Sequence, residues 1–597
     1  MKQTIANICP VVLNMNCIAA IQKFIYHICT NIFLMRIVEC IPNISEGRDK
    51  EKIQKIASVV EQISGVMLLD VDPGASTNRT VITFAGTPEG VEEAAFLLIR
   101  EAALHIDMRA HKGEHPRQGA TDVCPFVPVS EVSMEECVAM ARRLGERVGR
   151  ELQIPGYYYE NAATSEERRN LANCRKGEYE ALEKITSSGG KPDFGPAVIN
   201  DHVKKTGITT IGAREFLVAY NINLNTTSTR RANAIAFDIR EAGRVVNDDS
   251  TGKPKLDSNG EPMRVPGTLK AVKGIGWYIE EYGIAQLSLN LTNVDITPVH
   301  LAFEEACKKA DARGIRVTGS ELVGLIPLKS MIDAADHFLL KQQRSLGISE
   351  KEKIKIAVKS LGLDDLAPFQ PEDKIIEYII EKRLKNSGRL IAMDLKSFAD
   401  ETASESPAPG GGSVSAYAGA MASSLATMVA NLSAHKRGWD NRWQFFSDYA
   451  ITGMKCQREL LRLVDADTDA FNQIMQAFGL PKATEDEKKI RAQAIEHASK
   501  KAMEIPLQTA AIAVESFTVI QAMVEHGNPN SITDAGVGAL LARAAVLGAV
   551  MNVRVNASGI KDKEFAAQLL HRAEELEKQA EAWEAEIRSQ VNQKISL

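Results

Sequence analysis

The sequence predicts a multi-domain α+β protein, in which two ferredoxin-like α/β sandwich subdomains are followed by an all-α helical-bundle domain. Three observations carry this prediction. A β-α-β-β-α-β order begins near Met35, a similar order recurs after about residue 216, and strand patterns disappear after about residue 384. A chain of 597 residues also exceeds what one hydrophobic core holds.

The first 34 residues are apolar and weakly basic, but Asn14, Asn16 and Lys23 interrupt them before a membrane-spanning run accumulates. No small-residue cleavage site follows, which disfavours a secretory signal. We therefore expect an extension outside the fold. The predicted divisions, in order an extension, two subdomains, a linker and a helical domain, are residues 1–34, 35–216, 217–383, 384–391 and 392–597.

The first subdomain shows alternating apolar residues in its strands and side-chain caps at its helices. Thr87 is the expected N-cap of one helix, and Ser133 with Glu136 forms a capping box at another. In order, the expected elements are the strand 36–41, the helix 49–63, the strands VMLLDVD and RTVITFAG, the helix after Thr87, the strand DVCPFVPV, the helix after Ser133 and the strand IPGYYYE.

The second subdomain repeats the mixture of strands and helices. Between Val245 and Val265 a polar stretch without apolar periodicity predicts a surface insertion. The expected elements are the strand FLVAYNINLN, the helix TRRANAIAFDIREA, the strands GIGWYIEE and IAQLSLNLTN, a helix introduced by Thr297 and Pro298, and the strand IRVTGSELVG.

The helical domain contains long runs with helical periodicity, and small residues crowd the first and fourth of them. Pro506 lies inside the third run, which predicts a kink or break there. The small-residue faces also predict that the domain dimerises and that the full chain forms a homo-oligomer. The runs are 413–434, 439–478, 484–525, 531–556 and 561–592.

The segment AHKGEHPRQGATD contains the spacing H-x-x-E-H, by which some zinc peptidases present their ligands. Metal binding would require His111, Glu114 and His115 on one regular helical turn. Gly113 and Pro116 disfavour that helix, so we expect a loop and no metal site. Two imidazoles on a loop between a helix and a strand still suit proton transfer near neutral pH, although a solvated polar loop explains them equally well.

Two other patterns resemble known motifs only in part. SPAPGGGSVSA lacks the lysine of a phosphate-binding loop, which leaves a glycine turn entering a helix with free N–H groups. VDADTDAF begins like a calcium-binding loop, but Ala470 and Gln476 occupy the positions that require glycine and glutamate. We therefore expect neither nucleotide nor calcium binding at these places.

On a helix, Leu460, Val464, Asp467 and Phe471 share one face, so Asp467 lies within an apolar stripe. Burial raises the pKa of a carboxyl group, which makes Asp467 a candidate acid-base residue. The neighbouring Asp465 and Asp469 point elsewhere, and we expect ordinary pKa values for them.

Several long segments resemble the bifunctional formimidoyltransferase-cyclodeaminase family. ECIPNISEGRD, LLDVDPGASTNRTV, HKGEHPRQGATDVCPFVPV and AYNINLN are similar to its glutamate formimidoyltransferase part, as are GIGWYIEE and GSELVGLIPL. APGGGSVSAYAGAMASSLATMV, LVDADTDAF and RAAVLGAVMNVRVN are similar to formimidoyltetrahydrofolate cyclodeaminase. The resemblance covers nearly all of the chain from Met35 onward.

The resemblance implies two consecutive reactions of histidine degradation. The formimino group of N-formimino-L-glutamate moves to N5 of tetrahydrofolate, and 5-formiminotetrahydrofolate then cyclises to 5,10-methenyltetrahydrofolate with loss of ammonia. It also implies His115 as the proton-transfer residue of the first reaction and Asp467 as that of the second. His111, Glu114 and Arg117 are candidates for orienting His115 or for contacting carboxylates.

Other residues are expected to bind substrate or folate. Asp72 is a candidate for stabilising the amidinium charge, with a turn-forming role as the alternative. The segment FGPAVINDHVKKTG is shorter than its family counterpart, and its lysines suit a folate glutamate tail or a solvated loop. The candidate binding residues are Asp72, Arg117, Gly195, Pro196, Lys204, Lys205, Gly207, Gly410, Gly411, Gly412 and Ser413.

The expected partners are tetrahydrofolate as co-substrate, with or without a polyglutamate tail, and N-formimino-L-glutamate. A net charge of -6 disfavours nucleic-acid binding, and no membrane partner or tightly bound cofactor is expected. Nine scattered cysteines without paired spacing favour a reducing cytoplasm. The alternatives are a folate-binding protein that retains only one activity, a non-enzymatic folate-binding scaffold, and a metallohydrolase based on the histidine loop.

Overall fold

A computed structural model describes residues 36–75, 77–113, 117–186, 190–248, 251–258, 260–384 and 389–596. The chain divides into two compact units. The first runs to Val218 and includes Lys270–Lys273 and Asn290–Thr297, and the second contains the remaining residues. The expected N-terminal extension, residues 1–34, lies outside the described residues.

The first unit contains a seven-stranded mixed sheet in the order β1-β4-β2-β5-β7-β6, with β3 paired to β4. The strand β7 was not expected, and it pairs in parallel with both β5 and β6. All of its residues are buried, so the sequence TTIGA shows no alternation between apolar and polar positions. The strands are β1 (Ile37–Cys40), β2 (Asn43–Ile44), β3 (Val66–Gly74), β4 (Arg79–Gly86), β5 (Thr121–Ser130), β6 (Gly156–Glu160) and β7 (Thr209–Ala213).

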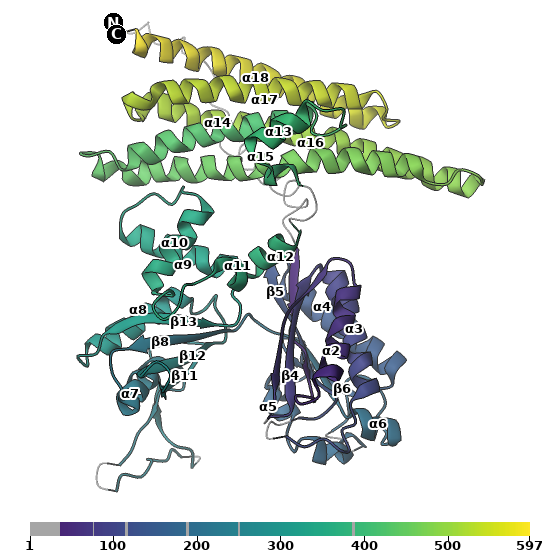
Figure 1. The fold of residues 1–597 in the computed structure, drawn as a ribbon, viewed down its shortest axis with the longest axis vertical. Coiled ribbons are helices and arrows are strands. Elements are labelled where there is room, and N and C mark those ends of the chain that lie inside the picture. Colours follow the sequence, from purple (N-terminus) through teal and green to yellow (C-terminus); the bar gives the residue numbers. More distant parts are fainter. Residues whose placement is uncertain are drawn as a thin grey trace, which may run out of the picture. The chain divides into compact units, whose positions relative to one another are not determined.

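Three helices cover one face of this sheet (Figure 1), where Ile82, Phe84 and Phe126 are fully buried. The predicted caps are confirmed: Thr87 accepts a hydrogen bond from the backbone of Gly90, and Ser133 and Glu136 form the capping box. The covering helices are α2 (Lys50–Ser58), α3 (Pro88–His105) and α4 (Met134–Arg147).

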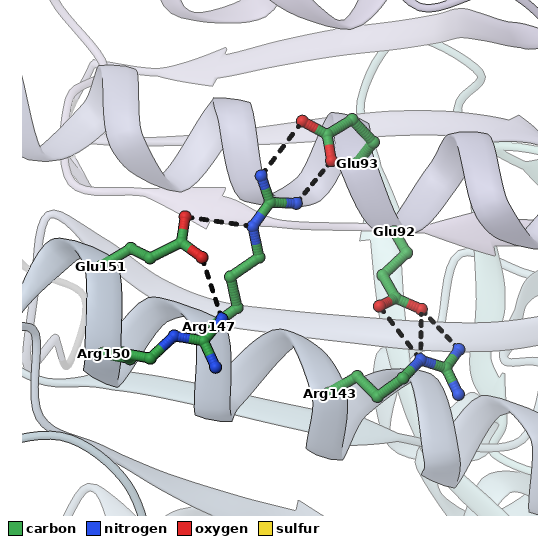
Figure 2. A network of polar contacts seen from close by, with 6 residues as sticks. All are labelled: Glu92, Glu93, Arg143, Arg147, Arg150 and Glu151. Carbon is green, nitrogen blue, oxygen red and sulfur yellow. Dashed lines mark hydrogen bonds and ion pairs between the residues drawn. The ribbon is translucent and has the colours of Figure 1, made fainter.

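The outer surfaces of α3 and α4 are joined by ion pairs (Figure 2). Arg143 pairs with Glu92, and Arg147 pairs with Glu93 and Glu151. Such exposed pairs contribute little to stability individually. Shorter segments complete the unit: η1 (Val59–Gln62), η2 (Val148–Leu152), η3 (Glu166–Arg169), α5 (Leu171–Cys174), η4 (Tyr179–Thr186) and α6 (Asp201–Thr206).

The second unit begins with a four-stranded sheet in the order β11-β12-β8-β13. The predicted insertion contains a short antiparallel ladder between β9 and β10. Four helices follow the last strand, where the sequence analysis assigned none. The elements are β8 (Val218–Leu224), α7 (Thr229–Ile239), β9 (Arg244–Val245), β10 (Arg264–Val265), β11 (Val272–Ile279), β12 (Ile284–Leu291), α8 (Val299–Asp311), β13 (Val317–Val323), α9 (Leu328–Lys341), α10 (Glu350–Leu361), α11 (Pro371–Lys374) and α12 (Ile376–Leu384).

The C-terminal part is helical, as predicted, and its core consists largely of alanine with valine, leucine and isoleucine. Two of its helices, α16 and α17, are long and apolar enough to span a membrane, although about half of each apolar window is buried within the protein. The elements are η6 (Leu390–Ala392), α13 (Leu395–Thr402), α14 (Gly411–Ala434), η7 (Asp440–Arg442), α15 (Trp443–Gly479), α16 (Glu485–His526), η8 (Pro529–Ser531), α17 (Ile532–Ala557) and α18 (Lys563–Ile595).

The helix α16 does not break at Pro506 but continues for 42 residues. Proline has no N–H to donate to the carbonyl oxygen of Ala502, one helical turn earlier. The side-chain amide of Asn556 donates to that oxygen instead, at 2.7 Å. A residue of α17 thus replaces the missing backbone hydrogen bond.

Candidate active sites

The histidine loop of the first unit is anchored to the turn that precedes β4. The Nε2–H group of half-buried His111 donates to the carbonyl oxygen of Asn78 at 2.8 Å, and Asn78 donates through its amide to the Lys112 carbonyl at 3.0 Å. A Cβ atom at Gly113 would lie 2.2 Å from the Thr77 carbonyl oxygen, so only glycine fits there. Residues 111–113 of the loop are therefore held against this turn.

The electrostatic setting of His111 favours a neutral ring. Burial lowers the pKa of His111 below its ordinary value, against the opposing effect of the hydrogen bond to Asn78. Its Nδ1 atom accepts a long hydrogen bond of 3.4 Å from Nε of Arg117. With Nε2 as donor and Nδ1 as acceptor, His111 is suited to positioning its neighbours and not to carrying a charge at pH 7.

The candidates His115 and Glu114 lie outside the described residues. Arg117 is described, and its guanidinium group is already paired. It donates to both carboxylate oxygens of Glu180, at 2.9 and 2.7 Å, and to Glu178 at 2.9 Å. These ion pairs of Arg117 connect the histidine loop to the segment 178–180.

The face of the sheet that points away from the helices carries polar residues. Asp72 on β3 pairs with Val81 on β4, Val81 pairs with Asn43 on β2, and Asn43 pairs with Val123 on β5. The row continues to Thr210 on β7. Paired residues share a face, so the exposed candidate Asp72 lies in one row with buried polar groups that sequence reasoning missed.

The expected folate segment packs against the histidine loop. Gly207 has a φ of 67° and pairs with Gly119, and a Cβ atom at Gly207 would lie 2.1 Å from the Gln118 carbonyl oxygen. Gly195 has a φ of 74°, and a Cβ atom there would lie 2.2 Å from the Ile154 carbonyl oxygen; half-buried Pro196 follows it. Glycine is therefore required at both turns for steric reasons.

The two lysines of this segment differ. The Lys205 ammonium group donates to the carbonyl oxygen of Leu104 near the end of α3, at 2.9 Å, which is a favourable place for a cation. Lys204 is exposed, and its backbone carbonyl accepts from the Tyr179 hydroxyl at 2.6 Å. Of the two, Lys204 has the side chain better placed to meet an anionic ligand.

In the helical domain, Asp467 on α15 lies against the N-terminus of α14. The Ser413 hydroxyl is 3.1 Å from Oδ2 of Asp467, and it is also 2.9 Å from the carbonyl oxygen of Val464. A Cβ atom at Gly412 would lie 2.2 Å from Oδ1 of Asp467. The structure thus brings together Asp467, Gly412 and Ser413, which were selected from separate stretches of sequence.

Burial raises the pKa of Asp467, and the hydrogen bonds from Ser413 only partly oppose this effect. Gly410 is the N-cap of α14 and provides no side-chain cap, so the first N–H groups of the helix are not capped by it. Gly411 lies near the side chain of Asn552 on α17. A carboxyl group with a raised pKa therefore faces a polar helix start.

The neighbouring aspartates correct one expectation. Asp469 is exposed, as the helical argument predicts, but Asp465 is half-buried and accepts a hydrogen bond from the backbone of Leu390 at 2.7 Å. Burial raises the pKa of Asp465 as well, because η6 covers it. Phe471 is 39% exposed, so the buried part of the stripe ends at Asp467.

Sequence reasoning also missed a chain of side-chain amides on the four-stranded sheet. Trp277 donates to Gln286 at 3.2 Å, Gln286 donates to Asn223 at 2.8 Å, and Asn223 donates to Asp365 at 3.0 Å. Asparagine is depleted from strands, so the alternating asparagines of NINLN could have indicated a polar network on this sheet. Among the residues that the structure describes, no group of three or more His, Cys, Asp or Glu side chains is placed to hold a metal.

Three family models match the sequence in succession. They are the formiminotransferase domain, N-terminal subdomain, over residues 37–214, the formiminotransferase domain over 219–381, and formiminotransferase-cyclodeaminase over 394–575. Together these matches extend over most of the described chain.

Curated relatives match most of the chain or one part of it. The formimidoyltransferase-cyclodeaminase of Gallus gallus is 43% identical over 92% of this chain and 98% of its own length. The glutamate formimidoyltransferase of Streptococcus pyogenes is 40% identical over 51% of this chain and 94% of its own length. The methenyltetrahydrofolate cyclohydrolase of Methylorubrum extorquens is 36% identical over 34% of this chain and 97% of its own length.

Proposed function

The chain belongs to the formimidoyltransferase-cyclodeaminase family, and from this membership we propose that it carries out both reactions on one polypeptide. The formimino group of N-formimino-L-glutamate is transferred to tetrahydrofolate, which releases glutamate. The resulting 5-formiminotetrahydrofolate is then converted to 5,10-methenyltetrahydrofolate and ammonia, in histidine degradation. The observation that carries the proposal is the 43% identity to a bifunctional relative over 92% of the chain.

The transfer reaction needs a group that moves a proton twice. N5 of tetrahydrofolate loses a proton as it attacks the amidine carbon, and the glutamate nitrogen must gain one before it leaves. We assign this role to His115, which follows the anchored segment 111–113. Neutral His111, fixed by Asn78, and Arg117, fixed by Glu178 and Glu180, hold the two ends of the loop.

The cyclisation reaction places the same demand on Asp467. N10 attacks the formimino carbon and loses a proton, and the departing nitrogen accepts a proton to leave as ammonia. A carboxyl group with a raised pKa can take the first proton as a base and return it as an acid. The Ser413 hydroxyl, 3.1 Å from the carboxylate, orients it for this exchange.

Folate is the shared co-substrate of both reactions, and each site offers elements suited to it. In the helical domain we propose that Gly410, Gly411, Gly412 and Ser413 meet a polar edge of the ligand, because the start of α14 presents backbone N–H groups. In the first unit we propose binding along Gly195, Pro196, Lys204, Lys205 and Gly207, and contact of Asp72 with the amidinium. No tightly bound cofactor takes part in this scheme.

We further propose a homo-oligomer in which the helical domain is one interface. The neighbouring helices α14 and α17 each carry exposed apolar residues at helical spacing, among them Met421 and Met428 on α14 and Leu540, Met551 and Val555 on α17. Apolar faces of this kind favour self-association. A cytoplasmic location is also proposed, since the cysteines that the structure describes all carry free thiols.

One coupled assay tests the proposed function. Purified protein is given N-formimino-L-glutamate and tetrahydrofolate, and ammonia and the absorbance of methenyltetrahydrofolate are followed together. Both products should rise in equal amounts. Accumulation of 5-formiminotetrahydrofolate without ammonia would leave only the transferase activity, and absence of any reaction would leave a folate-binding protein.

A further inference from the structure

Arg79, at the start of β4, carries a positive charge that forms no ion pair with the described part of the protein. Its Nε atom is buried without a hydrogen-bond partner, and the side chain forms no ion pair with another described residue. Burial lowers the pKa of Arg79, and the nearby charge of Arg175 lowers it further, against the opposing effects of Asp122 and Asp72. A partly buried cation without an ion pair destabilises a folded protein, so its presence requires another explanation.

Asp122, the anion that acts most strongly on Arg79, is already engaged elsewhere. Asp122, 1% exposed, forms an ion pair with Arg175 and accepts a hydrogen bond from the Gln118 backbone at 2.8 Å. Arg175 in turn has a buried Nε atom without a partner. Arg175 is thus paired with the buried carboxylate and Arg79 is not, and each guanidinium group retains an Nε–H donor without an acceptor.

The position of this charge relates it to the histidine loop. Arg79 is two residues before Val81, so both side chains lie on the sheet face that carries Asp72 and Asn43. The residue before it, Asn78, holds His111 and Lys112 through two hydrogen bonds. The uncompensated guanidinium thus stands beside the loop that leads to residues 114–116.

We propose that Arg79, together with Arg175, binds a carboxylate group of the amino-acid donor, N-formimino-L-glutamate. A guanidinium group presents parallel N–H donors that match the two oxygens of a carboxylate, and such charge-assisted pairs are strong when shielded from water. Buried Asn43 has a free Oδ1 atom on the same sheet face, which suits an N–H group of the donor. This inference rests on the proposed transferase function.

The test replaces Arg79 by glutamine in the full chain. With tetrahydrofolate saturating, the KM for N-formimino-L-glutamate should rise at least about tenfold, while kcat changes less. The KM for tetrahydrofolate and the rate with added 5-formiminotetrahydrofolate should stay near those of the unmodified protein. Arg143→Gln is the matched control, because Arg143 is an exposed arginine already paired with Glu92 and should leave every constant unchanged.

Thermal unfolding separates binding from a structural role. Removing an uncompensated charge should leave the unfolding temperature equal or higher, whereas loss of a structural ion pair would lower it. L-Glutamate, the product, should raise the unfolding temperature of the unmodified protein and of Arg143→Gln but not of Arg79→Gln.

Several results would overturn the assignment. An unchanged KM for the donor in Arg79→Gln would remove its basis, and a rise confined to the KM for tetrahydrofolate would assign the carboxylate to the glutamate tail of folate instead. A lower unfolding temperature with an unchanged glutamate response would indicate a structural arginine. If the unmodified protein transfers no formimino group, the proposed function fails first, and the glutamate response still decides whether Arg79 binds a carboxylate.

Discussion

The carboxylate of Asp467 lies directly against the backbone of Gly412, where an added Cβ atom would be 2.2 Å from Oδ1 and 2.5 Å from Oδ2. Atoms cannot approach so closely, so the residue at 412 and the carboxylate compete for one space. The first turn of α14 therefore determines where the proposed acid-base group of the cyclisation reaction is held.

Gly412→Ala should reduce cyclodeaminase turnover by about tenfold to a hundredfold, because the added methyl group displaces the Asp467 carboxylate. Stability should fall much less, since a terminal carboxylate can rotate away. Turnover of 5-formiminotetrahydrofolate and the unfolding temperature measure the two effects. Gly479→Ala, where nothing lies within 4 Å, is the control and should retain full activity. Equal activity in both variants would contradict this view of the site.

Asp467→Asn should reduce cyclodeaminase turnover by roughly two orders of magnitude or more, as expected for loss of an acid-base group, while formimino transfer stays near its original rate. Asp465→Asn should have little effect, because an asparagine oxygen can still accept the hydrogen bond from Leu390. Asp469→Asn should also have little effect at its exposed position. Comparable losses in all three variants would point to a cooperative carboxylate cluster.

The raised pKa of Asp467 also has a consequence for stability. A carboxyl group with a higher pKa in the folded state destabilises the fold at pH values above its unfolded pKa of about 4, and this penalty disappears as the pH falls toward that value. Asp467→Asn should therefore unfold at an equal or higher temperature than the original protein at pH 7. The difference should shrink as the pH is lowered from 7 toward about 4 in scanning calorimetry. A variant that is less stable at pH 7 would argue against a strained ionised carboxylate.

The two activities should be separable by mutation, since the residues assigned to them lie in different parts of the chain. His115→Ala should abolish formimino transfer, while purified 5-formiminotetrahydrofolate is still cyclised at the original rate. Separate assays of each half-reaction provide the measurement, and circular dichroism verifies folding. Loss of both activities in a folded variant would indicate a single shared site.

Replacing two exposed apolar residues of α17 should weaken self-association. Met551 and Val555 are 64% and 66% exposed, and Met551→Glu combined with Val555→Glu places two charges on the proposed interface. The molar mass from light scattering at micromolar concentration should fall. Gln568→Glu, on the exposed surface of α18, is the control and should leave the mass unchanged. A monomeric mass for the original protein would remove the proposed interface altogether.

Much of the fold could be predicted because short stretches of sequence determine where its helices and strands begin. The caps at Thr87 and Ser133 depend on residues three positions apart, and both are confirmed. The strand β7 was not predicted, because burial on both faces removes the alternation of apolar and polar residues. The continuation of α16 through Pro506 was not predicted either, because the compensating group, Asn556, is fifty residues away in sequence and belongs to another helix.

The candidate sites divide in the same way. The position of Asp467 follows from helical periodicity, so its partial burial could be anticipated. Burial of Asp465 could not, since it depends on Leu390, far away along the chain. The role of Arg79 could not be predicted either. Only the fold shows that Asp122 pairs with Arg175, which leaves Arg79 without an ion pair among the described residues.

The amide of Asn556 that serves the Ala502 carbonyl also limits where this chain can be divided. A fragment ending at the turn between α16 and α17 would contain the proline but not the group that substitutes for its missing N–H. Split versions of the helical domain should therefore keep α16 and α17 in one piece. The same dependence couples the two positions in any redesign: once Pro506 is replaced by a residue with its own N–H, the Ala502 carbonyl no longer depends on Asn556.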